Sequence, residues 1–97
     1  MVITKAVETG KTVVALEGRL DTTTAPELEA ALSEVSKEDV LVLDLEKLEY
    51  ISSAGLRVLL QQKKDRPEND SFVLTNVGAD VKEILDLTGF SDILNIQ

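Results

Sequence analysis

Side chains that alternate in type at the start of the chain predict a β-hairpin. The alternation covers residues 3–7, and Thr12 to Leu16 form a run rich in β-branched residues. Gly10 lies in the segment between them, where it provides the backbone freedom that a tight turn needs. We therefore expect two antiparallel strands joined by this turn.

The next apolar residues have the spacing of a helix. They fall on one helical face and are Leu28, Ala31, Leu32 and Val35. Candidate N-terminal caps precede them at residues 21–24. Thr24 and Glu27 have the spacing of a capping box, and Pro26 is tolerated in a first helical turn. The pattern predicts a helix that begins near Thr24.

An unbroken apolar run at Val40–Leu43 has the length of a strand. Such a run predicts burial on both faces, as in a central parallel strand. A short connection then leads to Ser52, Ser53 and Gly55, which open a second amphipathic helix. The apolar face of that helix is formed by Leu56, Leu59 and Leu60.

The C-terminal third continues the alternation of strand and helix. Residues 65–70 form a polar turn segment, and Phe72–Leu74 is a further short buried strand. Residues 76–78 lead into a third helix, whose inward face is expected to be Val81, Ile84 and Leu85. Gly89 occupies the position of a left-handed C-terminal cap, and Ser91 starts a final short turn that runs to Leu94.

The order ββαβαβα, with a short C-terminal helix, predicts a single α/β domain over residues 1–97. Its sheet would be mixed but mostly parallel, with right-handed crossovers. Parallel strands that end at Leu16, Leu43 and Leu74 would share one edge of the sheet. Function in open sheets collects outside such strand ends. The loops expected there contain residues 21–24, 52–55 and 76–78.

Composition narrows the classes of function. A formal charge of −8 over 97 residues argues against binding to nucleic acid or to anionic membrane surfaces. The chain has no cysteine and no histidine, so we expect no disulfide and no Cys/His zinc site. We also expect no other metal and no cofactor. We find no signal peptide and no apolar run long enough to insert into a bilayer, and expect a soluble, cytoplasmic protein.

A serine at the start of a helix can cap the helix, hold an anion or carry a phosphate. An enzyme with Ser52 or Ser53 as nucleophile would need a general base. Without histidine only Lys, Asp and Glu remain, and Lys63 and Lys64 lie two or more turns along the helix. We therefore expect no catalysis. Nucleotide binding is also disfavoured, because no glycine-rich phosphate loop follows a strand.

The same serines belong to a longer pattern that resembles a known family. The segment Asp44-Leu45-x-x-Leu48-x-Tyr50-Ile51-Ser52-Ser53-Ala54-Gly55-Leu56-x-x-Leu59 is similar to the signature of STAS domains, in particular the stand-alone bacterial anti-sigma-factor antagonists. A second block is Leu16-x-Gly18-x-Leu20-Asp21 followed by Thr24-Ala25-Pro26-Glu27-Leu28. A third, looser block is Leu85-x-Leu87-Thr88-Gly89-Phe90. The resemblance covers almost the whole chain.

The resemblance implies a phosphorylation switch. In such proteins the serine two positions before the glycine, here Ser53, is the regulatory phosphorylation site. The unphosphorylated form would bind an anti-sigma factor and free a sigma factor. That anti-sigma factor would itself be a serine kinase using ATP and magnesium, and a metal-dependent serine phosphatase would reset the switch. The alternative is a STAS accessory subunit of a lipid-transport ATPase or signalling assembly, without phosphorylation.

Two residues depart from the commonest pattern of the family. Ser52 stands where aspartate is frequent, and Ala54 stands where serine or threonine is frequent. Ser52 can cap the helix as aspartate does, but it also becomes a second candidate for phosphorylation. Gly55 is expected to let a partner's backbone approach the serine. Asp21 has two open interpretations, as a structural group at the first helix or as a group that orients a kinase or partner. The expected partner-binding residues are Asp21, Thr22, Ser52, Ser53, Ala54, Gly55, Arg57 and Asn76.

Overall fold

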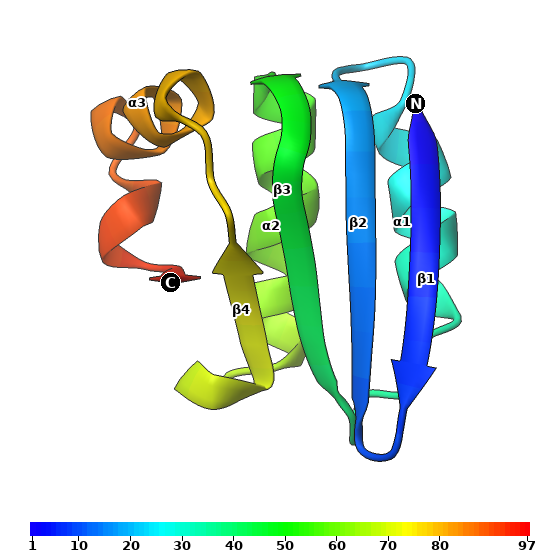
Figure 1. Cartoon of the computed structure of the whole chain (residues 1–97). Coiled ribbons are helices and arrows are strands. Elements are labelled where there is room, and N and C mark those ends of the chain that lie inside the picture. The colour runs from blue at the N-terminus through cyan, green and yellow to red at the C-terminus, as the bar shows by residue number, and fades with distance from the viewer.

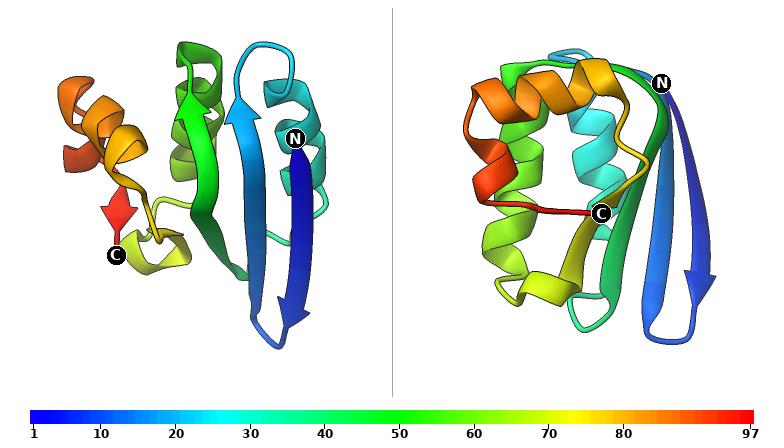
Figure 2. Two further views of the ribbon diagram at one scale, coloured as in Figure 1. Left: turned by 45° about the horizontal axis from the view of Figure 1, so that its top comes forward. Right: turned by 60° about the vertical axis from the view of Figure 1, so that its left-hand side comes forward.

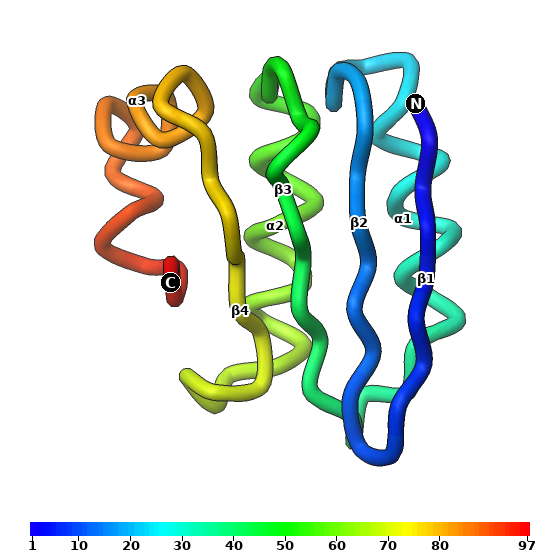
Figure 3. The backbone as a smooth tube through the Cα atoms, viewed as in Figure 1, coloured from blue at the N-terminus to red at the C-terminus, as the bar shows by residue number.

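The computed structural model describes the whole chain, Met1–Gln97, as one five-stranded sheet with helices packed on it (Figures 1 and 3). In chain order the elements are β1 (Val2–Glu8), β2 (Lys11–Leu20), α1 (Ala25–Ser33), β3 (Val40–Ile51), α2 (Ser53–Asp65), η1 (Asn69–Ser71), β4 (Phe72–Thr75), α3 (Ala79–Leu87), η2 (Phe90–Asp92) and β5 (Asn95–Ile96). The predicted mixed α/β architecture is confirmed. β1 and β2 pair as an antiparallel hairpin, and β2 to β5 are parallel neighbours.

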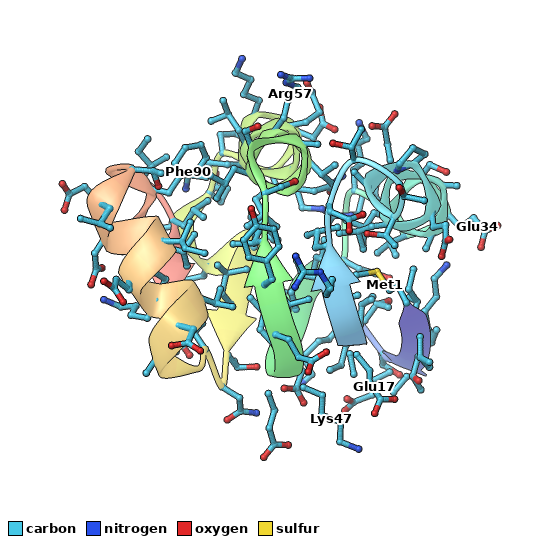
Figure 4. All side chains as sticks on the ribbon, turned by 90° about the horizontal axis from the view of Figure 1, so that it is seen from above. Met1, Glu17, Glu34, Lys47, Arg57 and Phe90 are labelled. Atoms are coloured by element: carbon cyan, nitrogen blue, oxygen red, sulfur yellow. The ribbon has the colours of Figure 1, made fainter.

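Helices α1 and α2 lie side by side on one face of the sheet (Figure 2). The strand order β1-β2-β3-β4-β5 means that each parallel crossover moves one strand in the same direction. Because such crossovers are right-handed, successive helices fall on the same face. Leu41 and Leu43 are fully buried beneath the helices, whereas Val42 is only half-buried on the opposite face. Glu17 and Lys47 project from that open face (Figure 4). The prediction that this strand is buried on both faces is wrong.

Strand β3 is much longer than the apolar run that predicts it. A connection is expected after Leu43, but the strand continues to Ile51. The buried residues in this extension are Leu45, Leu48 and Ile51. Their spacing of three residues makes the strand hard to recognise in the sequence, since a regular strand alternates with a period of two residues. The pairing with β2 slips by one residue after Ala15 and again after Gly18, and these bulges turn every third residue inward.

The C-terminal part agrees with the sequence pattern up to the end of α3. Gly89 has a left-handed backbone (φ 82), as predicted, and Phe90 packs against the core. The expected helical turn from Ser91 to Leu94 is instead the 3₁₀ turn η2, Phe90–Asp92. The chain then adds β5 beside β4, a strand too short to be recognised from its sequence. No helix is both long and apolar enough to cross a membrane.

Arg66 joins the two long connections at the far end of the sheet. It belongs to the segment predicted as a polar turn, but it is only 2% exposed. Its guanidinium donates hydrogen bonds to the backbone carbonyls of Ser36 (2.9 Å), Val35 (3.3 Å) and Asp39. Burial lowers the pKa of Arg66 from its ordinary value, and the charges of Asp39 and Asp65 act in the opposite direction. Arg66 therefore ties the end of α2 to the segment between α1 and β3.

Replacing Arg66 with alanine should lower the free energy of unfolding by about 2–4 kcal/mol. Three carbonyls would lose a charged donor, and a buried space would open. Chemical denaturation measures the change. Lys64→Ala is the matched control, because Lys64 is exposed in the last turn of α2, two residues before Arg66, and makes no ion pair, so a change within about 0.5 kcal/mol is expected. Equal losses in the two variants would contradict the proposed anchoring.

Candidate functional site

The ends of β2 and β3 lie side by side and bring two loops together. Leu20 and Ile51 are partners in the sheet register, and the Ser52 N–H donates a hydrogen bond to the Leu20 carbonyl oxygen at 2.9 Å. The loop at residues 21–24 therefore starts next to the N-terminus of α2. Figure 2 shows both strand tips at the same end of the molecule. The structure therefore confirms that the loops at residues 21–24 and 52–55 share one edge of the sheet, as predicted.

Gly55 allows α2 to approach these strand ends closely. The residue is buried, and a Cβ atom at this position would lie 2.6 Å from Leu20 Cγ and 2.9 Å from Ile51 Cγ1. Real carbon atoms do not approach so closely without displacement. Gly55 is thus required by packing inside the domain. The expectation that its missing side chain receives a partner's backbone is wrong, because this face of Gly55 is turned toward the sheet.

The two candidate acceptor serines have opposite environments. Ser52 is the residue that precedes α2, with an extended backbone (φ −97, ψ 176), but its side chain makes no capping hydrogen bond. Its Oγ is buried and has no hydrogen-bond partner, so the predicted cap is absent. Ser53 is the first residue of α2 and is exposed to solvent. The N–H groups of its turn lack intrahelical acceptors, and the first helical hydrogen bond runs from Leu56 N to Ser52 O at 2.9 Å.

Asp21 organises the neighbouring loop. Its Oδ1 accepts hydrogen bonds from the N–H groups of Thr23 (3.0 Å) and Thr24 (3.2 Å). The bond from Thr24 is the main reason that the pKa of Asp21 lies below its ordinary value, and the nearby Arg19 acts in the same direction. The structural interpretation of Asp21 is confirmed. The carboxylate remains half-exposed, so its role toward a partner stays a prediction.

Thr24 does not form the predicted capping box with Glu27. It occupies the N-cap position with a helical backbone (φ −96, ψ −18) and makes no side-chain cap hydrogen bond. Its Oγ1 instead donates to the Arg19 carbonyl at 2.8 Å and accepts from the Asp21 N–H at 2.9 Å. The threonine side chain therefore closes the loop onto the end of β2. In a capping box the glutamate carboxylate accepts a hydrogen bond from the N–H of the N-cap residue. Here the carboxylate of Asp21, three residues before Thr24, accepts that bond instead.

Sequence reasoning missed a stacked pair at this end of the sheet. Arg19 and Tyr50 are register partners on β2 and β3, and Arg19 Cζ lies 4.4 Å from the centre of the Tyr50 ring. Arg19 is exposed and forms no salt bridge, so the ring holds a free cation close to both loops. Each of the two residues lies two positions before a loop that the sequence identifies. That adjacency is the signal by which they could have been found.

Asn76 is not part of this cluster. β4 pairs with β3 only as far as Asp44, and its last residue is Thr75. The side chain of Asn76 donates to Asp44 Oδ1 at 3.1 Å. Asp44 and Ile51 are seven positions apart on β3, which corresponds to about 23 Å of extended chain. The predicted grouping of Asn76 with Ser53 is therefore wrong, because β4 stops well before the end of β3.

A groove runs between α1 and α2 and reaches the candidate site. It has a volume of about 880 Å³, and Thr22 and Ala54 line it near Ser53. Arg57 also borders it, and Figure 4 shows this side chain projecting from α2 on the side away from the sheet. Ala54 packs against the core and is only half-exposed. Thr22 and Arg57 are exposed, as a surface that meets a partner requires.

Comparison with known protein families gives a match over nearly the whole chain. The family model that matches is the STAS domain, over residues 2–97. BtrV of Bordetella bronchiseptica, assigned as an anti-sigma factor antagonist, is 40% identical over 90 residues, which cover 90% of this chain and 78% of BtrV. The anti-sigma-B factor antagonist of Listeria monocytogenes is 32% identical over 83 residues, 82% of this chain and 73% of that protein.

A solved structure shares the same arrangement of strands and helices. The crystal structure of an anti-sigma factor antagonist from Mycobacterium paratuberculosis superposes with a TM-score of 0.81 at 25% sequence identity. The superposition covers 98% of this chain and 83% of that one. It therefore includes the elements that carry the candidate site.

Gly55→Ala should destabilise the domain by about 1–3 kcal/mol, because the new methyl group must displace Leu20, Ile51 or the start of α2. Thermal or chemical unfolding measures the loss. Gly78→Ala is the matched control, since Gly78 is the N-cap residue of α3, also close to the start of a helix, and a Cβ there meets nothing within 4 Å. We expect its effect to stay below about 1 kcal/mol. If Gly55→Ala is as well tolerated, the close packing at the start of α2 does not fix the site.

Proposed function

Because this chain belongs to the STAS domain family, we propose that it is an anti-sigma factor antagonist controlled by phosphorylation of Ser53. The unphosphorylated form binds an anti-sigma factor and thereby releases a sigma factor for transcription. Phosphorylation ends this binding. The relatives named as anti-sigma factor antagonists support this function over that of a transporter accessory subunit. The proposed place of action is the cytoplasm, where sigma factors meet RNA polymerase.

The proposal that Ser53 is the phosphorylated residue rests on the different environments of Ser52 and Ser53. Ser53 presents its side chain at the exposed start of α2, next to the loop that Asp21 organises. Ser52 directs its Oγ into the protein, where a kinase does not reach it without opening the start of the helix. Thr22 and Arg57 are exposed on either side of the groove near Ser53 and complete the proposed partner-binding surface.

In the proposed reaction this chain is the substrate and the anti-sigma factor is the kinase. The Ser53 oxygen forms a bond to the γ-phosphorus of ATP, the bond from that phosphorus to ADP breaks, and the hydroxyl proton passes to a base on the kinase. Magnesium accompanies the ATP on the kinase. A metal-dependent serine phosphatase reverses the modification by hydrolysis. This chain contributes the hydroxyl group and its position, and no catalytic group or cofactor.

The phosphate acts on the interface rather than on the fold. It adds roughly −1.5 to −2 charges at pH 7, and negative charge is favourable at the N-terminus of a helix. α2 should therefore persist after phosphorylation. A partner that packs against the small hydroxyl would instead have to desolvate a doubly charged group. A penalty of about 1.5–3 kcal/mol weakens binding by roughly ten- to more than a hundredfold.

Ser53 should be the only residue labelled when the purified chain is incubated with its cognate kinase and ATP. Intact mass should rise by a single phosphoryl group, and peptide mapping should place it on Ser53. Ser53→Ala should abolish labelling, whereas the matched control Ser52→Ala should leave it in place, since Ser52 Oγ is buried. Labelling that survives in Ser53→Ala and disappears in Ser52→Ala would show that the acceptor lies one residue earlier.

Phosphorylated protein, and the mimic Ser53→Asp more weakly, should lose affinity for the anti-sigma factor without losing stability. A charge at the start of α2 typically contributes 0.3–1 kcal/mol, so the melting temperature should stay the same or rise slightly. Calorimetric titration against the partner and melting curves of both forms separate the two effects. Ser53→Ala is the control and should still bind. A large fall in melting temperature on phosphorylation would mean that the switch works by local unfolding.

A further inference from the structure

One basic side chain on α2 has the position of an internal partner for a phosphate on Ser53, provided that Ser53 is the phosphorylated residue as proposed above. Arg57 follows Ser53 by four residues, so the two share one side of the helix. Side chains at this spacing have Cβ atoms about 5–6 Å apart. Helical side chains also lean toward the N-terminus, which directs Arg57 toward the turn that contains Ser53.

Arg57 is also free to take such a partner. It is exposed on the side of α2 away from the sheet (Figure 4) and forms no salt bridge or side-chain hydrogen bond. Four lysines of the chain are already paired with carboxylates, namely Lys5, Lys11, Lys37 and Lys82. Of the two other arginines, Arg66 is buried and bound to backbone carbonyls, and Arg19 is stacked on the Tyr50 ring at the ends of β2 and β3. Arg57 is therefore a free guanidinium one turn from the proposed acceptor.

We propose that Arg57 binds the phosphate of phosphorylated Ser53 through an i,i+4 ion pair on α2. The planar guanidinium donates two parallel hydrogen bonds to phosphate oxygens, a geometry that lysine cannot reproduce. The acidic member of the pair precedes the basic one, which is the favourable order in a helix. The same residue faces a partner in the unphosphorylated form, since it borders the groove beside Ala54.

This pairing gives phosphorylation a second effect on the binding surface. Before modification the surface at this turn presents the cation of Arg57 beside a neutral hydroxyl. Afterwards the phosphate carries excess negative charge, and Arg57 is engaged by it. A partner that placed a carboxylate opposite Arg57 would then lose its attraction and gain a repulsion at the same position. The modification removes a contact as well as introducing a charge.

The pairing can be measured without any partner protein. Phosphoserine is incorporated at position 53 of the full chain during synthesis, and the phosphate is titrated by ³¹P NMR between about pH 4 and pH 9, around its second pKa. A nearby cation favours the dianion and lowers this second pKa, so the dianion should bind a proton about two- to fourfold more weakly in the parent chain than in Arg57→Gln. Arg57→Lys should fall between them, because it keeps the charge but not the fork.

Lys64→Gln is the matched control for the loss of one positive charge. Lys64 is exposed on the same helix, eleven residues after Ser53, which is about 16 Å along the axis, so its loss should leave the titration unchanged. The N–H groups at the start of α2 are the same in all variants, so their effect on the phosphate pKa cancels from the comparison. If Arg57→Gln titrates like the parent chain, the ion pair is wrong. Because no kinase is used, failure of enzymatic labelling at Ser53 overturns the proposed function without changing this result.

Discussion

The close approach of α2 to the ends of β2 and β3 is the constraint on which the site depends. Gly55 makes it possible, because any side chain there would overlap Leu20 or Ile51. With the helix held against both strands, the backbone of Ser52 is fixed by its hydrogen bond to Leu20, and its Oγ turns inward. The next residue must then begin the helix on the outside. The exposure of Ser53 is therefore a consequence of core packing, and it requires no flexible loop.

The irregular half of β3 determines which loops share the functional end of the molecule. Two bulges keep leucine and isoleucine side chains turned inward while the strand extends to Ile51. β2 pairs with β3 as far as Leu20, so the loop of Asp21 lies at the same end of the sheet as the start of α2. β4 ends opposite Asp44, and α3 takes the space beside the upper part of β3 (Figure 1). The site is thus built by two loops rather than three, and the third loop is fastened to the middle of the sheet through Asn76 and Asp44.

Much of this could be predicted from the sequence, because the fold class and the order of elements depend on local patterns. Periodicity identifies the hairpin, the three helices and the buried starts of the parallel strands, and the motif around Ser53 locates the site. The missed features are set by pairing across the sheet. The spacing of Leu45, Leu48 and Ile51 resembles neither strand nor helix until the bulges opposite β2 are known. Arg66 looks like a residue of a polar turn, because the carbonyls that it binds come from residues about 30 positions earlier. The role of Gly55 is hidden for the same reason, since its neighbours Leu20 and Ile51 belong to two other elements.

A switch built on this scaffold gains from rigidity. The start of α2 is held by backbone hydrogen bonds and core contacts that do not involve the Ser53 side chain, so a change at that side chain leaves the supporting structure in place. The unpaired N–H groups of the first turn also favour added negative charge. The free energy of phosphorylation is then not spent on rearranging the domain. Phosphorylation instead weakens the contact with the partner that faces Ser53, and each 1.4 kcal/mol of lost attraction there corresponds to a tenfold loss of affinity. A small domain of marginal stability can in this way change its affinity for a partner by a large factor while its own folded state stays the same.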